Sequence, residues 1–188
     1  MFNRSPFNIE PPPSIPDDCD IVFVGDMFSS DHLGGAELTT DAIIDSSTYK
    51  VFKLHSNKVT EVLLSQGIRK HWIFGNYSSM DWNLIPTIVA NLNYSIIEFD
   101  YKYCKYRSTE KHEQAENMPC DCQNQMYGKM VSAFYYGAKS LWWMSEKQMQ
   151  KYHQAFPFLE QIKNTVLSSV FNSDFFSEID HLRKKTQG

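Results

Sequence analysis

The chain has 188 residues, of which 42% are hydrophobic, 21% charged and 14% aromatic. This composition is too apolar for a disordered tail and provides a core for one large domain. The net charge of −4 gives no basic field, so we expect no nucleic-acid partner. No apolar run approaches the roughly 20 residues of a membrane span, and four cysteines do not make a disulfide scaffold. The sequence therefore predicts a cytoplasmic protein without a transmembrane segment.

Residues 1–18 are predicted to be a proline-rich extension outside the fold. The prolines at 11–13 and Pro16 favour polyproline geometry and remove backbone hydrogen-bond donors. The segment has no apolar stretch typical of a secretory signal. The domain itself is predicted to occupy residues 19–188.

Strands and helices alternate along the first half of this domain. Ile21 to Gly25 is short, continuously apolar and rich in β-branched residues, which is typical of a strand buried on both faces. In chain order we expect a strand at 21–25, a helix opened by Gly34-Gly35, a strand at 51–54, a helix at 58–66, a strand at 72–74 and a helix from about 84.

The second half continues the alternation around one long irregular segment. In chain order we expect a strand at 95–99, irregular chain over about 100–125, a helix at 126–137, a strand at 141–144, a helix after Ser145, a strand at 165–170 and a final helix capped by Asp174. The Trp142-Trp143 and Phe175-Phe176 pairs are expected in the core. Six strand-helix units predict an α/β, Rossmann-like, doubly wound and mainly parallel sheet in a single domain.

Such sheets bind ligands at the carboxyl ends of their strands. Gly34 and Gly35 follow the first strand and open a helix. Adjacent glycines let bare amides approach a phosphate, aided by the helix dipole, so donor phosphate binding is one interpretation. A tight turn with close helix packing is the other. The loop is neither G-x-G-x-x-G nor a P-loop, which disfavours a dinucleotide or Walker site.

Two further strand ends carry polar residues. Asn76 follows the third strand and either donates to a ligand hydroxyl or satisfies its own turn. Asp100 follows the fourth strand and is the candidate catalytic residue, as a general base toward a hydroxyl. The alternative is that Asp100 pairs with Lys102 or Arg107 and does no chemistry. Tyr101 and Arg107 are candidates for stacking on or clamping a substrate.

The irregular segment also holds Cys104, His112, Cys120 and Cys122. Three thiols and one imidazole are the ligand types of tetrahedral zinc. A loop of this length needs something to fix it, and a metal ion would do so. The sequence therefore predicts a structural zinc site, with a redox pair, free thiols or a solvated His112 as alternatives.

Four segments resemble the amino-terminal domain of GT-B glycosyltransferases of the retaining "glycosyl transferase group 1" (family 4) type. The opening DIVFVGDMFSSDHLGGAELTTDAI is similar to that family's first strand, glycine loop and first helix. EFDYKYCKYRS and the later CDC resemble its H-D-Y segment with trailing cysteines. AKSLWWMSEKQMQKYHQAFP resembles the next strand, serine and helix, and NTVLSSVFN occupies the place of the strand leading out of the domain. The similarity covers about residues 20–175 in consistent order.

The resemblance implies transfer of a sugar from a nucleotide-sugar donor to a hydroxyl acceptor. It implies that Gly34 and Gly35 face the donor diphosphate, that Asp100 lines the acceptor cleft, and that the leaving group needs no metal ion. Where the family has a histidine before Asp-Tyr, this sequence has Phe99. The lobe that binds the donor base and ribose is not in these 188 residues, so we expect a separate chain or a second copy to supply the other half.

Two other classes stand beside this hypothesis. The domain is alternatively a non-catalytic binding or assembly module derived from a glycosyltransferase domain, with the zinc-pinned loop as its recognition surface. A nucleotide-dependent oxidoreductase is disfavoured, because the sequence lacks both G-x-G-x-x-G and an acidic ribose partner at the expected place.

Overall fold

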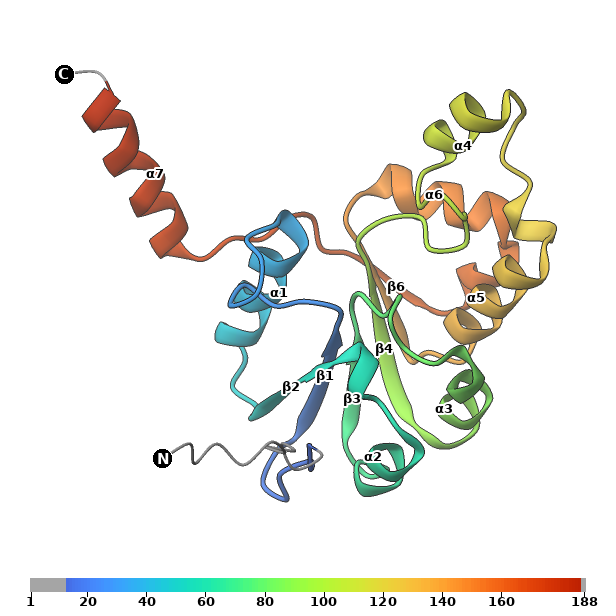
Figure 1. Ribbon diagram of the computed structural model, residues 1–188, viewed down its shortest axis with the longest axis horizontal. Helices are drawn as coiled ribbons and strands as arrows, with labels where there is room; N and C mark the ends of the chain where they lie inside the picture. Colours follow the sequence, from blue (N-terminus) through green and yellow to red (C-terminus); the bar gives the residue numbers. More distant parts are fainter. Residues whose placement is uncertain (1–12, 187–188) are drawn as a thin grey trace, which may run out of the picture.

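Six strands form the centre of the molecule, with helices packed around them (Figure 1). This computed structural model describes residues 13–186. The strands are β1 (Ile21–Gly25), β2 (Val51–His55), β3 (His71–Phe74), β4 (Asn93–Glu98), β5 (Ser140–Trp143) and β6 (Lys163–Val166). The helices are α1 (Gly35–Asp45), α2 (Glu61–Gln66), α3 (Ile85–Asn91), α4 (Thr109–Glu116), α5 (Met126–Tyr136), α6 (Glu146–Ala155) and α7 (Ser173–Thr186).

The sheet has the strand order β2-β1-β3-β4-β5-β6, and every neighbouring pair is parallel. The order reverses between β1 and β3, because the chain first adds β2 on one side of β1 and then places β3 on the other. All strands therefore end at the same edge, where the segment between β4 and α5 lies (Figure 1). The predicted Rossmann-like α/β fold is confirmed.

Alternate residues of each strand point to opposite faces of the sheet, which gives two separate cores. The larger core joins one face to α2, α3, α5 and α6, and its fully buried strand residues include Val22, Val24, Trp72, Phe74, Tyr94, Ile96 and Trp143. The smaller core joins the other face to α1 and has Phe23, Phe28, Ile73 and Ile97 at its centre. Trp143 is buried as predicted, and Trp142 on the opposite face is half-buried.

The segment predicted as irregular contains a helix, α4. Ser108 begins this helix, because its Oγ accepts a hydrogen bond from the backbone N–H of Lys111 at 3.2 Å. His112 is the buried residue of α4, and the other side chains are polar or small. α4 therefore lacks the apolar stripe by which a helix is recognised from sequence.

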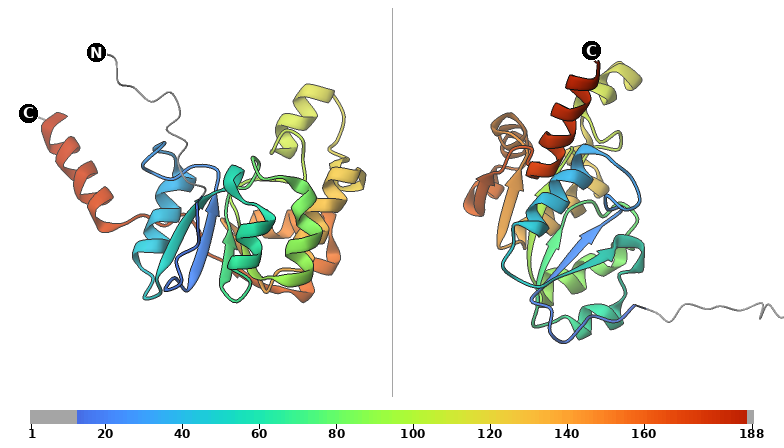
Figure 2. Two further views of the ribbon diagram at one scale, coloured as in Figure 1. Left: turned by 60° about the horizontal axis from the view of Figure 1, so that its bottom comes forward. Right: turned by 90° about the vertical axis from the view of Figure 1, so that its left-hand side faces the viewer.

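The end of the domain also differs from the prediction. β6 ends at Val166, not at residue 170, and the chain leaves the sheet where Ser168 takes a left-handed φ of 63°. α7 begins at Ser173, so Asp174 lies inside the helix and its expected position as the cap is wrong. Asn172 precedes the helix, and its Oδ1 accepts from the backbone N–H of Phe175 at 3.0 Å. Figures 1 and 2 show α7 projecting away from the sheet. Phe176 is 55% exposed there, and its predicted core position is also wrong.

The predicted proline-rich extension is partly joined to the domain. Ile15 is buried in the larger core, and its backbone N–H donates to the side-chain oxygen of Gln66 at 3.4 Å. Lys70 Nζ donates to the carbonyl oxygens of Asp17 and Cys19. The packed part of the chain therefore starts before residue 19. Residues 1–12 lie outside the described range.

Candidate metal centre and adjoining polar cluster

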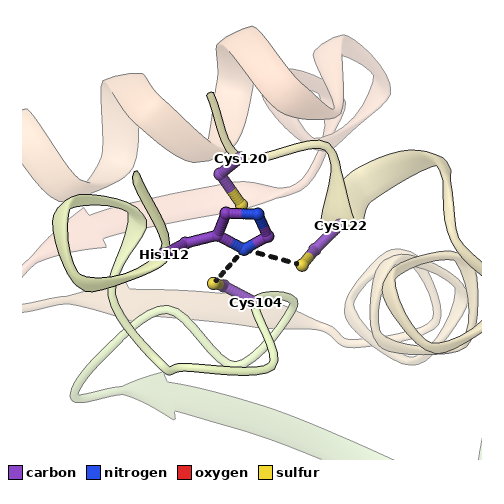
Figure 3. Close-up of side chains that lie close together, drawn as sticks. All are labelled: Cys104, His112, Cys120 and Cys122. Carbon is purple, nitrogen blue, oxygen red and sulfur yellow. Dashed lines mark hydrogen bonds between the residues drawn. The ribbon is translucent and has the colours of Figure 1, made fainter. Parts of the chain in front are cut away.

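Cys104, His112, Cys120 and Cys122 come together beyond the carboxyl ends of the strands. Their ligand atoms all lie within 4.8 Å of one another. Nδ1 of His112 is 3.7 Å from Sγ of Cys104 and 3.4 Å from Sγ of Cys122 (Figure 3). Cys104, His112 and Cys122 are buried, and Cys120 is half-buried. This group of residues can hold a metal ion.

Three different elements bring the four side chains together. Cys104 lies in the turn that follows β4, and His112 is on α4. Cys120 lies just before the short 3-10 turn Cys122–Asn124, which Cys122 opens ahead of α5. Gly128 in the first part of α5 lies directly against this turn, and a Cβ added there would clash with the carbonyl oxygen of Cys122. The close approach of α5 to the ligand turn therefore requires a glycine at this position.

The two distances from the His112 nitrogen to cysteine sulfurs match tetrahedral coordination. With Zn–S bonds of about 2.3 Å and Zn–N bonds of about 2.0–2.1 Å, tetrahedral geometry separates sulfur from nitrogen by about 3.6 Å. The observed separations are 3.7 and 3.4 Å. Without a metal ion, burial raises the pKa of the Cys120 thiol to about 12, and the neighbouring Cys104 and Cys122 side chains add to this. Binding of a metal ion would therefore release the thiol protons of these cysteines, because the metal ligand is the thiolate.

A polar cluster lies beside this group at the carboxyl ends of β3 and β4. One Asp100 oxygen, Oδ2, accepts a hydrogen bond from Nε of Arg107 at 2.6 Å and forms an ion pair with Nη2 at 2.6 Å. Arg107 Nη2 also donates to Oδ1 of Asn76 at 3.3 Å. Burial alone would raise the pKa of Asp100, but Lys102 and Arg107 outweigh it and hold that pKa below its usual value. Three of the predicted site residues thus meet: Asp100, Arg107 and Asn76.

A buried ion pair between Glu98 and Lys102 contacts this cluster through Asp100. Glu98 and Lys102 have side chains only 1% and 2% exposed, and Lys102 Nζ is 2.9 Å from Oε1 of Glu98. The other Glu98 oxygen accepts from the hydroxyls of Tyr135 and Tyr152. Lys102 Nζ also lies 3.4 Å from Oδ1 of Asp100. Burial raises the pKa of Glu98 although Lys102 opposes the shift.

Asp26 connects three loops at the switch point and is not among the residues that the sequence motifs indicate. Its carboxylate accepts from the Ser56 hydroxyl at 2.5 Å, from the Ser78 hydroxyl and backbone N–H, and from the Ser79 N–H at 3.0 Å. Burial alone would raise the pKa of Asp26, but these hydrogen bonds hold it below its usual value. The sequence feature that could have indicated Asp26 is its position directly after β1, because ligands bind at that edge of the sheet.

The remaining predicted site residues are placed elsewhere. The ring of Tyr101 packs parallel to Tyr152, with centroids 6.1 Å apart, and Lys151 Nζ lies 5.1 Å above it. Gly34 caps α1 and Gly35 is its first residue. A Cβ on Gly35 would meet nothing within 4 Å, so close packing does not require that glycine, whereas a Cβ on Gly34 would clash with the Glu37 carboxylate. An acidic group therefore already lies at this helix start.

Comparison with known proteins adds no family to these observations. No protein-family model matches the chain, and no curated protein matches it significantly. The glycosyltransferase resemblance stays a prediction from the sequence motifs. Among residues 13–186, no helix is both long enough and apolar enough to cross a membrane.

Proposed function

We propose that this domain is the acceptor-side lobe of a glycosyltransferase that uses a nucleotide-sugar donor, and that a structural zinc ion fixes its Cys/His segment. The observation that carries the proposal is the cluster of Asp100, Arg107 and Asn76 at the carboxyl edge of the sheet. Parallel sheets of this class bind ligands at that edge. The order of the glycosyltransferase-like motifs along the sequence supports the same assignment.

The polar cluster has the chemistry that a sugar hydroxyl requires. Asp100 offers carboxylate lone pairs, Arg107 offers N–H donors, and Asn76 offers both. The side chains of Asp100 and Arg107 are each 30% exposed, so a ligand can reach them. Because the pKa of Asp100 is lowered, its carboxylate is ionised at neutral pH and is a weak base. We therefore assign it first to orienting the acceptor hydroxyl, and to accepting its proton only as the glycosidic bond forms.

The proposed zinc ion acts as a structural element. Cys104, His112, Cys120 and Cys122 would supply three thiolates and one imidazole, which is the full ligand set of a structural zinc site and would leave no open position for substrate. When bound, the ion would fix the chain between β4 and α5 and supply no chemistry to the transfer. The four cysteines are free thiols in the structure. Because metal-binding thiols must stay reduced, we propose the cytoplasm as the location.

The donor side of the proposal rests on Gly34 and Gly35. Their amides would face the donor diphosphate, but the Glu37 carboxylate at Gly34 must first turn away, since like charges repel. In our proposal the nucleotide is bound mainly by an opposite lobe that lies outside these 188 residues. This half of the site contributes amides and the α1 dipole.

Sugar binding tests the acceptor assignment directly. The full chain is titrated with a panel of mono- and disaccharides and followed by saturation-transfer NMR. We expect Arg107→Gln to weaken binding of any sugar that binds by about tenfold or more, because a hydrogen bond to a charged group contributes about 1.5–3 kcal/mol. The matched control is Arg69→Gln, an exposed arginine before β3 at the opposite edge of the sheet. Failure of every sugar to bind, or equal binding by Arg107→Gln, would contradict the acceptor assignment.

A non-catalytic binding module is the second candidate. Its specific support is the ion pairing of Asp100 with Arg107 and Lys102, which occupies the carboxylate that would act as the base. A transfer assay with nucleotide sugars, run with the chain alone and with a candidate donor-binding partner, separates the two candidates. Sugar binding without transfer in both reactions would favour the binding module.

A further inference from the structure

Arg107 lies between two of the four metal-ligating residues. Cys104 precedes it in the turn after β4, and His112 follows it on α4. A metal ion held by both side chains would close this part of the chain into a short loop that contains Arg107. The position of Arg107 in space is therefore tied to the metal centre through the backbone on either side.

The backbone at Arg107 is in a conformation that needs support. Its φ is 55°, in the left-handed region that residues other than glycine rarely adopt. Arg107 N–H donates to the carbonyl oxygen of Cys104 at 2.8 Å, and Cys104 N–H donates to that of Tyr101 at 2.9 Å. Tyr101 N–H donates back to the carbonyl oxygen of Arg107 at 3.3 Å. Cys104 is thus both a candidate metal ligand and the centre of the turn that holds Arg107.

The same turn forms a wall of the adjoining cavity. A pocket of about 410 Å³ is lined by Arg107, Gln125 and Tyr127 together with the ligand residues Cys104 and Cys122. From this wall the guanidinium of Arg107 reaches Asp100 and Asn76. Arg107 therefore joins the two groups: it lines this pocket beside Cys104 and Cys122, and it pairs with Asp100 in the polar cluster.

We propose that the metal ion positions Arg107. With the ion bound, the turn keeps Arg107 left-handed and its guanidinium on Asp100 and Asn76; without it, the turn relaxes and the polar cluster separates. This inference rests on the proposed function, because it takes the Cys/His group as a metal site and the cluster as the acceptor site. Sugar binding then depends on a metal ion that touches no substrate.

Hydrogen exchange of the full chain tests this coupling without any substrate. Amide exchange is measured by NMR with one equivalent of zinc and after removal of zinc by a chelator. We expect the amides of Arg107 and Cys104 to exchange at least about tenfold faster without zinc, while amides in the central strands β1 and β4 stay protected. Unchanged exchange at Arg107 would overturn the inference. Loss of protection throughout the sheet would also overturn it, because the metal ion would then stabilise the whole domain and not the turn at Arg107 in particular.

Variants at position 107 test the coupling in the reverse direction. If zinc favours a left-handed residue there, a residue that resists this conformation must weaken zinc binding. Arg107→Val and Arg107→Asn both remove the guanidinium, but valine strongly resists a positive φ and asparagine tolerates it. We expect Arg107→Val to lower zinc affinity by about tenfold relative to Arg107→Asn. Equal zinc affinities would contradict the inference.

Variants of the ligand His112 separate this inference from the proposed function. His112→Cys retains four ligand atoms and should retain both zinc and slow exchange at Arg107, whereas His112→Ser should lose both. A wild-type chain that binds no zinc overturns the metal site and this inference together. Zinc binding with unchanged exchange at Arg107 overturns this inference alone. A response at Arg107 in a chain that binds no sugar supports the coupling and refutes the acceptor assignment.

Discussion

The buried ion pair of Glu98 and Lys102 gives the most quantitative prediction. We consider Lys102→Met, which keeps the long side chain and removes its charge. Both side chains of the pair are almost fully buried, and Lys102 Nζ is 2.9 Å from the Glu98 carboxylate. The substitution therefore leaves a carboxylate in the core without its cation.

The expected magnitude follows from what remains around Glu98. Breaking a buried pair by removing one partner costs about 3–5 kcal/mol. Glu98 still accepts from the hydroxyls of Tyr135 and Tyr152 and from the backbone N–H of Asp100, so we expect the lower end, about 3 kcal/mol. For a domain of this size, each kcal/mol moves the melting temperature by about 2–4 °C. The melting temperature should therefore fall by about 6–12 °C.

The penalty should also depend on pH. Burial raises the pKa of Glu98 in the folded state, so its ionised form destabilises the fold as the pH rises through that value. Loss of Lys102 raises this pKa further, because the attractive charge is gone. Lys102→Met should thus be most destabilising at pH 8 and less so at pH 5, where more of Glu98 can be protonated.

Urea unfolding followed by circular dichroism, at pH 5 and pH 8, measures these free energies. The double variant Glu98→Gln, Lys102→Met should recover about 2 kcal/mol, because it removes the unpaired charge. Lys50→Met is the control, since Lys50 and Asp18 form an exposed pair that should have no measurable effect. A Lys102→Met variant as stable as the parent at both pH values would refute the account of this core.

Three further predictions concern other parts of the domain. The contribution of Asp26 to the free energy of unfolding should be present above its ordinary pKa of 3.8 and lost as the pH falls through the lower pKa of the folded state. Asp26→Asn should therefore be less stable than the parent at pH 7, and its melting temperature should fall less steeply in acid. Gly128→Ala should lower the free energy of unfolding in urea by about 1–3 kcal/mol and weaken zinc binding, because the added Cβ clashes with the Cys122 carbonyl. The Cβ of Gly35→Ala meets open space, so this variant should be more stable than the parent by about 0.4–1 kcal/mol. Chelation of zinc should lower the melting temperature of the parent and leave that of Cys122→Ser unchanged, with Cys19→Ser responding as the parent does.

Much of the architecture could be predicted because its signals are local. Continuous apolar runs such as Ile21 to Gly25 mark strands buried on both faces, and their alternation with helices fixes a parallel sheet. Ser145 was recognised as a helix cap, and its Oγ accepts from the N–H of Gln148 at 3.1 Å. The grouping of Cys104, His112, Cys120 and Cys122 could also be predicted, since residue type alone selects Cys and His as a set that can hold a metal ion.

The polar supports could not be predicted because their partners are distant in the sequence. Asp26 binds serines that lie 30 and 52 residues further along the chain, and only the folded sheet brings those loops together. Glu98 lies in an apolar strand, and nothing in that run shows that Lys102 turns back to meet it. The core position predicted for Phe176 is wrong for a different reason. An apolar stripe on a helix predicts a buried face but does not show which element covers it, and Phe176 is exposed.

Metal analysis combined with X-ray absorption at the zinc edge tests the central claim most directly. The account predicts about one zinc ion per chain, with three sulfur atoms at about 2.3 Å and one nitrogen at about 2.0 Å, and loss of the ion when Cys120 and Cys122 are both changed to serine. A purified chain that takes up no zinc when it is supplied, or a zinc ion surrounded by oxygen ligands, would contradict it.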